Sequence, residues 1–132
     1  SAVDYVAGEG LLMAPTVAVS ELLKRNGLKL QDFDFYEIHE AFAGQVLCTM
    51  KAWESAEYCK TRLGRSEPLG KIDRSKLNVR GSSIALGHPF AATGAKIVGV
   101  LAKILHSAGP GKRGLIVVCT AGGMGVATIL ES

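Results

Sequence analysis

The sequence predicts an α/β domain in which helices cover a sheet. Helical patterns alternate with short strand patterns along the chain. A continuous apolar run typical of a fully buried strand spans 115–119, and a second strand pattern follows at 126–131. The segment 120–125 between them is rich in glycine, which indicates a tight turn, so we expect these two strands to form a hairpin.

The composition is that of an ordinary globular domain. The chain has 132 residues, of which 48% are hydrophobic and 20% charged, which is sufficient for a hydrophobic core and is not typical of a disordered chain. The formal net charge is +3. Acidic residues are interspersed with the basic ones, so no basic stripe indicates nucleic-acid binding.

The cysteines Cys48, Cys59 and Cys119 are odd in number and have no CxxC spacing. This pattern predicts neither a zinc site nor a disulfide framework, and it fits a reducing compartment. We see no signal peptide and no apolar run of the roughly 18 residues that a membrane-spanning helix needs. We therefore expect a soluble protein without a metal site.

The first quarter of the chain predicts a strand, a helix and a turn. Residues 1–15 have the pattern of a strand end followed by a loop. Because the chain opens without an initiator methionine, we expect Ser1 to lie inside a longer polypeptide. Residues 15–26 predict a helix that Gly27 ends, and 31–34 predict a turn.

His39 lies between a predicted strand at 35–39 and a predicted amphipathic helix at 40–53. The expected apolar face of that helix consists of Ala43, Val46, Leu47 and Met50. In open α/β sheets the carboxyl ends of strands hold ligand sites, so His39 is a candidate site residue. A histidine that merely caps or bridges this turn would give the same local pattern.

The segment 54–78 is the polar part of the chain, with a short helix expected at 56–63 and a loop after it. A charge cluster of this kind is usually a solvated face. The alternative is a segment that contacts a phosphate-bearing ligand, a partner subunit or a membrane surface.

His88 stands between Gly87 and Pro89, which predicts a sharp bend that dictates the orientation of the imidazole. Such a histidine suits catalysis, although glycine and proline also punctuate plain turns. The longest helix is expected at 91–107, with small residues at its start. Apolar residues surround much of this helix, so we expect it to be buried on more than one side.

Cys119 lies at the edge of the predicted hairpin turn. The exposed backbone N–H groups of a tight glycine-rich turn can stabilise an oxyanion. The turn matches neither a dinucleotide fingerprint nor a P-loop. On local evidence a buried, inert cysteine is as good an interpretation of Cys119.

Three segments in order resemble the C-terminal half of the thiolases: His39-Glu40-Ala41-Phe42-Ala43, Gly87-His88-Pro89, and Cys119 with the glycine-rich segment 120–125. The resemblance covers essentially all of residues 1–132. It implies a thiolase fold, in which two similar βαβαβαββ halves pack into a five-layered subunit with a mixed sheet and a buried helix in each half. This chain resembles one such half that lacks its first strand and helix.

The resemblance also implies an activity. Thiolases use coenzyme A to cleave 3-oxoacyl-CoA into acetyl-CoA and a shortened acyl-CoA, or they catalyse the reverse condensation. By the family pattern, His88 activates the nucleophilic cysteine and helps to bind the thioester oxygen, and Cys119 is the acid/base. This role suits a cysteine with a pKa near neutral. The backbone N–H of Ala121 would help to form a second oxyanion hole, and Gly122 would keep the turn narrow. Ala41 and Phe42 follow His39 in the family's site segment.

Two departures from the family refine the interpretation. Many thiolases have Asn where this chain has His39, and a His there resembles the thiolase subunits of fatty-acid β-oxidation complexes. The hairpin turn reads Cys119-Thr120-Ala121 where Cys-x-Gly is commoner, and only a backbone N–H is required at Ala121. Neither Cys48 nor Cys59 occupies a motif of the acyl-accepting cysteine, so we expect that nucleophile in an absent N-terminal half and no turnover by this chain alone.

The resemblance implies coenzyme A as a cosubstrate and no permanently bound cofactor. The implied partners are acyl-CoA, the N-terminal half, a second copy in a homodimer or larger oligomer, and a hydratase/dehydrogenase subunit. The implied compartment is the bacterial cytoplasm, or the mitochondrial matrix or peroxisome of a eukaryote. An acyl-CoA-binding or assembly module without catalysis remains the alternative, and a condensing synthase is a third.

Overall fold

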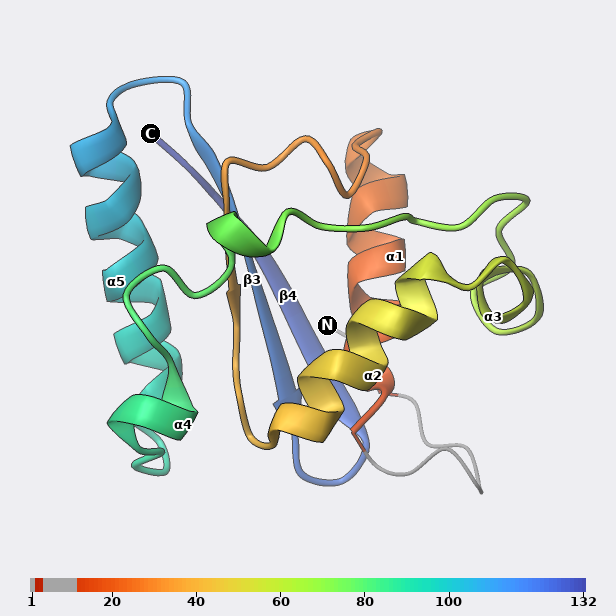
Figure 1. Cartoon of the computed structure of the whole chain (residues 1–132), viewed down its shortest axis with the longest axis horizontal. Coiled ribbons are helices and arrows are strands. Elements are labelled where there is room, and N and C mark those ends of the chain that lie inside the picture. The colour runs from red at the N-terminus through yellow and green to blue at the C-terminus, as the bar shows by residue number, and fades with distance from the viewer. Residues whose placement is uncertain (1, 4–11) are drawn as a thin grey trace.

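Four strands form one mixed sheet within the described part of the chain. The computed structural model describes residues 2–3 and 12–132 (Figure 1). The strands are β1 (Ala2–Val3), β2 (Phe35–Ile38), β3 (Arg113–Thr120) and β4 (Met124–Glu131). They lie in the order β1-β4-β3-β2, with β2 parallel to β3 and the other pairs antiparallel. The predicted hairpin is therefore confirmed as β3 and β4.

Helices cover both faces of this sheet. They are α1 (Ala14–Asn26), α2 (Ala43–Glu54), α3 (Ala56–Thr61), α4 (Ser83–Leu86) and α5 (Thr93–Ala108), and a 3-10 turn spans Arg74–Lys76. Figure 1 shows α5 on one face and α1 and α2 on the other. Because side chains alternate along a strand, Leu115 and Val117 of β3 join the larger core under α1 and α2, whereas Ile116 joins the smaller core under α5.

Two glycines allow the helices to approach the sheet closely. A Cβ atom at Gly125 of β4 would lie 2.5 Å from the carbonyl carbon of Ala14, and one at Gly114 of β3 would lie 2.6 Å from a methyl group of Leu101. Neither contact leaves room for a side chain. The glycines thus fix where α1 and α5 cross the sheet.

The two long helices differ in burial, and here one prediction is wrong. Only one stripe of α5 is buried: Thr93, Ile97, Leu101, Ile104 and Leu105. Val98 on the outer side is 42% exposed, and the small residues Gly94 and Gly99 also face outward. By contrast, α1 buries most of its surface between β4 and the segments on its other side. Apolar and small residues at the surface of α5 give the same sequence pattern as a helix covered on both sides.

The elements on the α2 side agree in outline with those predicted from the sequence. The strand at 35–38 is confirmed, but α2 begins at Ala43 because residues before it are extended, with Phe42 at φ −147° and ψ 143°. Val46 and Met50 are buried as expected. Ala43 and Leu47 are exposed instead, because the buried face is rotated toward Thr49 and Trp53. α4 was not expected from the sequence.

The structure corrects the expected list of elements. A strand and a helix were expected to be missing at the start, but β1 and α1 precede β2. One strand of the βαβαβαββ pattern is reduced to a single bridge, and it lies later in the chain. There Leu77 makes a parallel bridge to Tyr36 at the free edge of β2. The loop expected in the first 15 residues falls largely at 4–11, outside the described residues. No helix in the described ranges is long and apolar enough to cross a membrane.

The polar segment 54–78 is more than a solvated face. α3 forms where a short helix was expected, and most charged side chains of the segment are exposed. However, Cys59, Leu69 and Ile72 are buried in the larger core. Arg65 also donates from Nε to Ser20 Oγ at 2.8 Å, which ties the segment to α1.

Candidate functional site

The candidate site lies at the edge of the sheet where β2 and β3 end. The two strands are parallel, with Ile38 opposite Val117, so their carboxyl ends meet at one edge. His39 follows directly, and its backbone N–H donates to the Val117 carbonyl at 2.8 Å. The hairpin turn, α4 and the first turns of α2 and α5 lie at the same end of the molecule (Figure 1). All three sequence motifs therefore contribute to this edge.

His39 and His88 form a pair at this edge. Their ring centroids are 4.4 Å apart, and the ring of Phe90 lies 4.8 Å from that of His88. The Nδ1 atom of His39 lies 2.9 Å from Ser83 Oγ, and Nδ1 of His88 lies 2.8 Å from Thr93 Oγ1. Each imidazole is thus held by one hydroxyl, which leaves the Nε2 atoms for other partners.

The two histidines differ in their environment. His39 is 2% exposed, whereas His88 is exposed. Burial lowers the pKa of His39, and the neighbouring His88 and Lys96 lower it further, against a smaller opposite effect of Glu40. The pair thus combines a neutral, fixed imidazole with an accessible one.

Backbone geometry orients His88 as the sequence predicts. Gly87 ends α4 at φ 84° and ψ 169°, a conformation in which an L side chain is strained. After Pro89, the Thr93 hydroxyl donates to the Pro89 carbonyl at 3.1 Å and so closes the turn into α5. Ala91 within this turn has a φ of 66°, which is unusual for alanine.

Asn78 and Glu40 connect the two histidine segments, and sequence reasoning missed both. The side chain of Asn78 acts as a strand partner for β2: its Oδ1 accepts from the Ile38 N–H at 2.8 Å, and its Nδ2 donates to the Ile38 carbonyl at 2.9 Å. Asn78 Nδ2 also donates to Glu40 Oε1 at 2.9 Å, and Glu40 Oε2 accepts from the Ile84 N–H at 3.2 Å. The only sequence signal for Asn78 is that this polar residue stands three positions before Gly81, a glycine that a turn requires.

Cys119 lies at the same edge but on the other side of the sheet. It pairs with Gly125, whose missing side chain points at Ala14, so the thiol lies on the α1 side. Cys119 is 6% exposed, and burial raises the pKa of its thiol. Burial in this structure thus moves the pKa of the thiol away from neutrality. Among the described residues we find no hydrogen bond between Cys119 and either histidine.

The hairpin turn has the narrow geometry that the glycines predict. Gly122 and Gly123 adopt φ values of 82° and 75°. The described non-glycine residues with positive φ are Asn78 and Ala91, so Ala121 has a backbone that tolerates its β-carbon. Ala121 and Gly122 are exposed.

Large apolar side chains are exposed in four segments at this end of the sheet, and we call them the apolar rim: Phe42 (63% exposed), Ile84 (62%), Leu86 (57%), Phe90 (85%) and Met124 (40%). Of these, Phe90 contacts the ring of His88. Ala41 beside Phe42 is half-buried. Apolar side chains gathered around polar groups mark binding surfaces, so this edge fits a ligand or another protein surface. Within residues 12–132 no cluster of three or more His, Cys, Asp or Glu side chains could hold a metal ion.

Comparisons with known proteins agree with this geometry. The family model "Thiolase, C-terminal domain" matches residues 2–132. A 3-ketoacyl-CoA thiolase of Shewanella sp. (strain W3-18-1) is 45% identical over 131 residues, which cover 99% of this chain and 29% of that protein. The chain thus spans less than a third of the length of this curated relative.

Two solved structures share the fold. The dimeric peroxisomal thiolase of Saccharomyces cerevisiae superposes with a TM-score of 0.70 at 34% identity, over 92% of this chain and 26% of that one. The Acat5 thiolase from Ascaris suum, solved in complex with coenzyme A, superposes with a TM-score of 0.71 at 31% identity, over 92% and 27% of the two chains. The match of the family model over nearly the whole chain, together with these likenesses, shows that the chain belongs to the thiolase family, in its C-terminal domain.

Proposed function

We propose that this chain is the acid/base and oxyanion-binding half of a degradative thiolase. The complete protein would cleave 3-oxoacyl-CoA with coenzyme A, giving acetyl-CoA and a shortened acyl-CoA in fatty-acid β-oxidation. The nucleophilic cysteine would come from an N-terminal half outside these residues. The observation that carries this proposal is the contact between His39 and His88 at a strand edge with an apolar rim.

The chemistry divides between the two halves as follows. His88 accepts the proton of the nucleophilic thiol, and the thiolate attacks the 3-oxo carbon of the substrate. The bond between C2 and C3 then breaks, and C2 takes the electron pair as an enolate of acetyl-CoA. His88 and His39 would face the developing thioester oxyanion, and Cys119 would give its proton to C2 across the edge of the sheet where β2 and β3 both end. The thiol of coenzyme A next returns a proton to Cys119 and attacks the acyl-enzyme, which releases the shortened acyl-CoA and restores the nucleophile.

The burial of Cys119 suits the cleavage direction. Because burial raises the pKa of this thiol, Cys119 is protonated at neutral pH and can act as an acid without a preceding step. The N–H of Ala121 lies in the narrow hairpin turn beside it, where a second oxyanion would be stabilised. The apolar rim of Phe42, Ile84 and Phe90 would contact the acyl chain or the other half.

The outer face of α5 is where we expect the N-terminal half to pack. Added β-carbons at Gly94 and Gly99 would meet no atom within 4 Å, and Val98 between them is 42% exposed. Small residues allow another backbone to approach closely. An apolar face of this kind on the longest helix is costly in water, so a covering domain would stabilise it.

One observation favours the alternative of a non-catalytic acyl-CoA-binding or assembly module. Cys48 is an exposed residue of α2 and Cys59 is buried in α3, so neither supplies a second thiol among the site residues described above. An N-terminal half without a cysteine at the nucleophile position would support this alternative. A condensing synthase would instead show turnover in the direction of carbon–carbon bond formation only.

The proposal is tested with the full polypeptide that carries this chain. We expect cleavage of 3-oxoacyl-CoA substrates that depends on added coenzyme A, measured as loss of the 3-oxo thioester absorbance over a series of chain lengths. Cys119→Ser should retain the fold and lose the carbon–carbon cleavage step, and Cys48→Ser is the matched control with full activity. Absence of cleavage with every chain length would contradict the proposal, as would full activity in Cys119→Ser.

Partners and compartment follow from the same proposal. One solved relative is a dimer, and another binds coenzyme A, which supports coenzyme A and a second copy as partners here. A hydratase/dehydrogenase subunit would be a further partner. We expect a reducing compartment, the cytoplasm of a bacterium or the mitochondrial matrix or peroxisome of a eukaryote. Native mass spectrometry of the 13.9 kDa chain as purified shows whether a second polypeptide accompanies it.

A further inference from the structure

Three polar atoms from segments near the histidine pair are buried and have no hydrogen-bond partner among the described residues: Glu37 Oε1 on β2, Ser82 Oγ just before α4, and Lys96 Nζ on the first turn of α5. Glu37 is 2% exposed, and so is Ser82. Unpaired buried polar atoms are rare in proteins, and these three call for an explanation.

Strand direction, chain neighbours and charge interactions relate these three side chains to His39. Glu37 and His39 are two residues apart on β2 and so project from the same face of the strand. Ser82 precedes Ser83, which bonds His39. Lys96 follows Thr93 by about one helical turn, and its charge acts on both Glu37 and His39.

The other groups that face His39 are few. The loops on either side supply His88 and Glu40. The neighbouring strand β3 presents the apolar residues Ile116 and Val118 on this face, and α4 carries no charged residue. Lys96 is thus the one ammonium among the described groups that act on His39.

An unpaired ammonium or carboxylate in a buried site is strongly unfavourable, so these atoms need partners. An internal water molecule satisfies such atoms when two to four polar groups converge on it. Lys96 offers three donors, Glu37 offers an acceptor, and the Ser82 hydroxyl offers either. The cluster therefore has the composition of a water site.

We propose that Glu37, Ser82 and Lys96 bind internal water near His39, and that Lys96 is a positioning residue that acts with burial and His88 to keep the His39 imidazole neutral. Its positive charge opposes an imidazolium at His39, while water shared with the Glu37 carboxyl group makes the burial of that charge tolerable. A neutral His39 can donate a single, fixed hydrogen bond beside the accessible His88. The importance of this for catalysis rests on the proposed thiolase function, but the water site and the charge effect do not.

Titration of the histidines in the full polypeptide tests the charge effect. We would record the imidazole resonances of histidine-labelled protein between pH 4 and pH 9 and assign His39, His88 and His106 by substitution. Lys96→Met should raise the pH at which His39 titrates, because a positive charge is removed nearby. Lys96→Arg should leave it unchanged, since the charge is retained. His106, which is exposed near the far end of α5, is an internal reference that should not shift.

The matched control is Lys103→Met, the same substitution at an exposed position of the same helix. Should Lys96→Met not fold, Lys96→Gln keeps hydrogen-bonding capacity without the charge and should give the same shift. An unchanged His39 titration in either folded variant overturns the proposal. This readout needs no turnover, so its failure is distinguishable from failure of the proposed thiolase activity.

A high-resolution crystal structure of the full polypeptide tests the water site. We expect an ordered water within hydrogen-bond distance of the Glu37 carboxylate, the Lys96 ammonium and the Ser82 hydroxyl. A dry, direct contact between Lys96 and Glu37 would overturn the proposal, and so would a Lys96 side chain turned out to solvent.

Discussion

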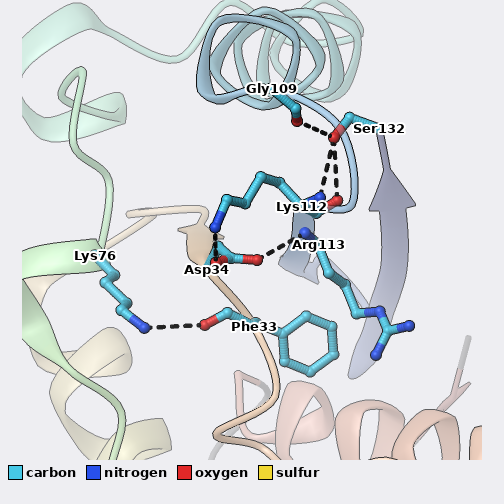
Figure 2. Close-up of polar contacts among 7 residues, drawn as sticks. All are labelled: Phe33, Asp34, Lys76, Gly109, Lys112, Arg113 and Ser132. Carbon is cyan, nitrogen blue, oxygen red and sulfur yellow. Dashed lines mark hydrogen bonds and ion pairs between the residues drawn. The ribbon is translucent and has the colours of Figure 1, made fainter.

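The two ends of the sheet satisfy their polar groups in different ways. At the amino end of β2 and β3, Asp34 accepts from the Arg113 N–H at 3.0 Å and from Lys112 Nζ at 3.1 Å (Figure 2). Ser132 donates to the Gly109 carbonyl at 2.7 Å, and Lys76 donates to the Phe33 carbonyl at 3.4 Å. These groups are paired and partly open to solvent.

At the carboxyl end several polar groups are buried, and some of their atoms are unpaired. Glu37, Ser82 and Lys96 have buried atoms without partners, and Ala91 has a strained backbone. Local features that cost stability are expected at functional sites, where the rest of the fold compensates for them. The comparison teaches that the amino end fixes the sheet, whereas the carboxyl end holds side chains ready for chemistry.

The largest expected effect comes from breaking the histidine pair. In the full polypeptide, His88→Ala should lower kcat/KM for 3-oxoacyl-CoA cleavage by more than ~10²-fold, because it removes both the base and an oxyanion donor. His106→Ala, at the opposite end of α5, should leave kcat/KM unchanged. Near-normal activity in His88→Ala would mean that this end of the sheet is not the catalytic end.

The next largest effect is expected at Asn78, whose side chain bonds both the backbone of Ile38 and the carboxylate of Glu40. Asn78→Ala would leave the N–H and carbonyl of Ile38 without their partners and free Glu40. We expect the free energy of unfolding to fall by about 2–3 kcal/mol, measured by urea denaturation. The control Asn26→Ala, which removes one exposed bond to the Leu22 carbonyl, should cost much less. Equal losses in the two variants would contradict the role given to Asn78.

The carboxyl groups at the two ends should also change the free energy of unfolding in opposite directions as the pH rises. The Arg113 N–H, and then Lys112, hold the pKa of Asp34 below its ordinary 3.8, so its stabilisation is present above that pH and lost as the pH falls through the lowered value. Burial raises the pKa of Glu37 from 4.5 to about 7, so the folded state disfavours its carboxylate, and stability falls as the pH rises from about 4.5 to 7.

Replacing each carboxyl group by its isosteric amide separates the two pH dependences of the free energy of unfolding. Asp34→Asn should remove part of the loss of unfolding free energy in acid, and Glu37→Gln should remove part of the loss between pH 4.5 and 7. Urea unfolding at a series of pH values measures both. A Glu37→Gln protein with the wild-type slope in that window would show that this carboxyl does not titrate there.

The smallest expected effect tests the backbone strain at the carboxyl end. Ala91→Gly should raise the free energy of unfolding by about 1 kcal/mol, because a φ of 66° is unfavourable for a residue with a β-carbon. Ala102→Gly, on the exposed face of α5, should instead lower it by about 0.5–1 kcal/mol. A loss of stability in both variants would mean that the turn before α5 relaxes without the strain.

Much of the fold could be predicted because its signals are local. The buried run of β3, the glycine turn, the bend at His88 and the αL end of α1 at Gly27 each depend on a few neighbouring residues. The boundaries of α2 and its buried face could not, because they depend on the extended backbone of Phe42 and on which side of α2 packs against the core. The sequence also predicts more burial for α5 than the structure shows, since an apolar helix face has the same pattern whether or not another element covers it.

The sequence by itself determined the family, the histidine motifs and the hairpin, because those depend on residue types in order along the chain. Only the tertiary structure decided which of them meet. It brings His39 into contact with His88, places Cys119 on the opposite side of the sheet, and buries unpaired polar atoms of Glu37, Ser82 and Lys96. The physical reason is that burial and charge act through space, between residues that the chain keeps far apart.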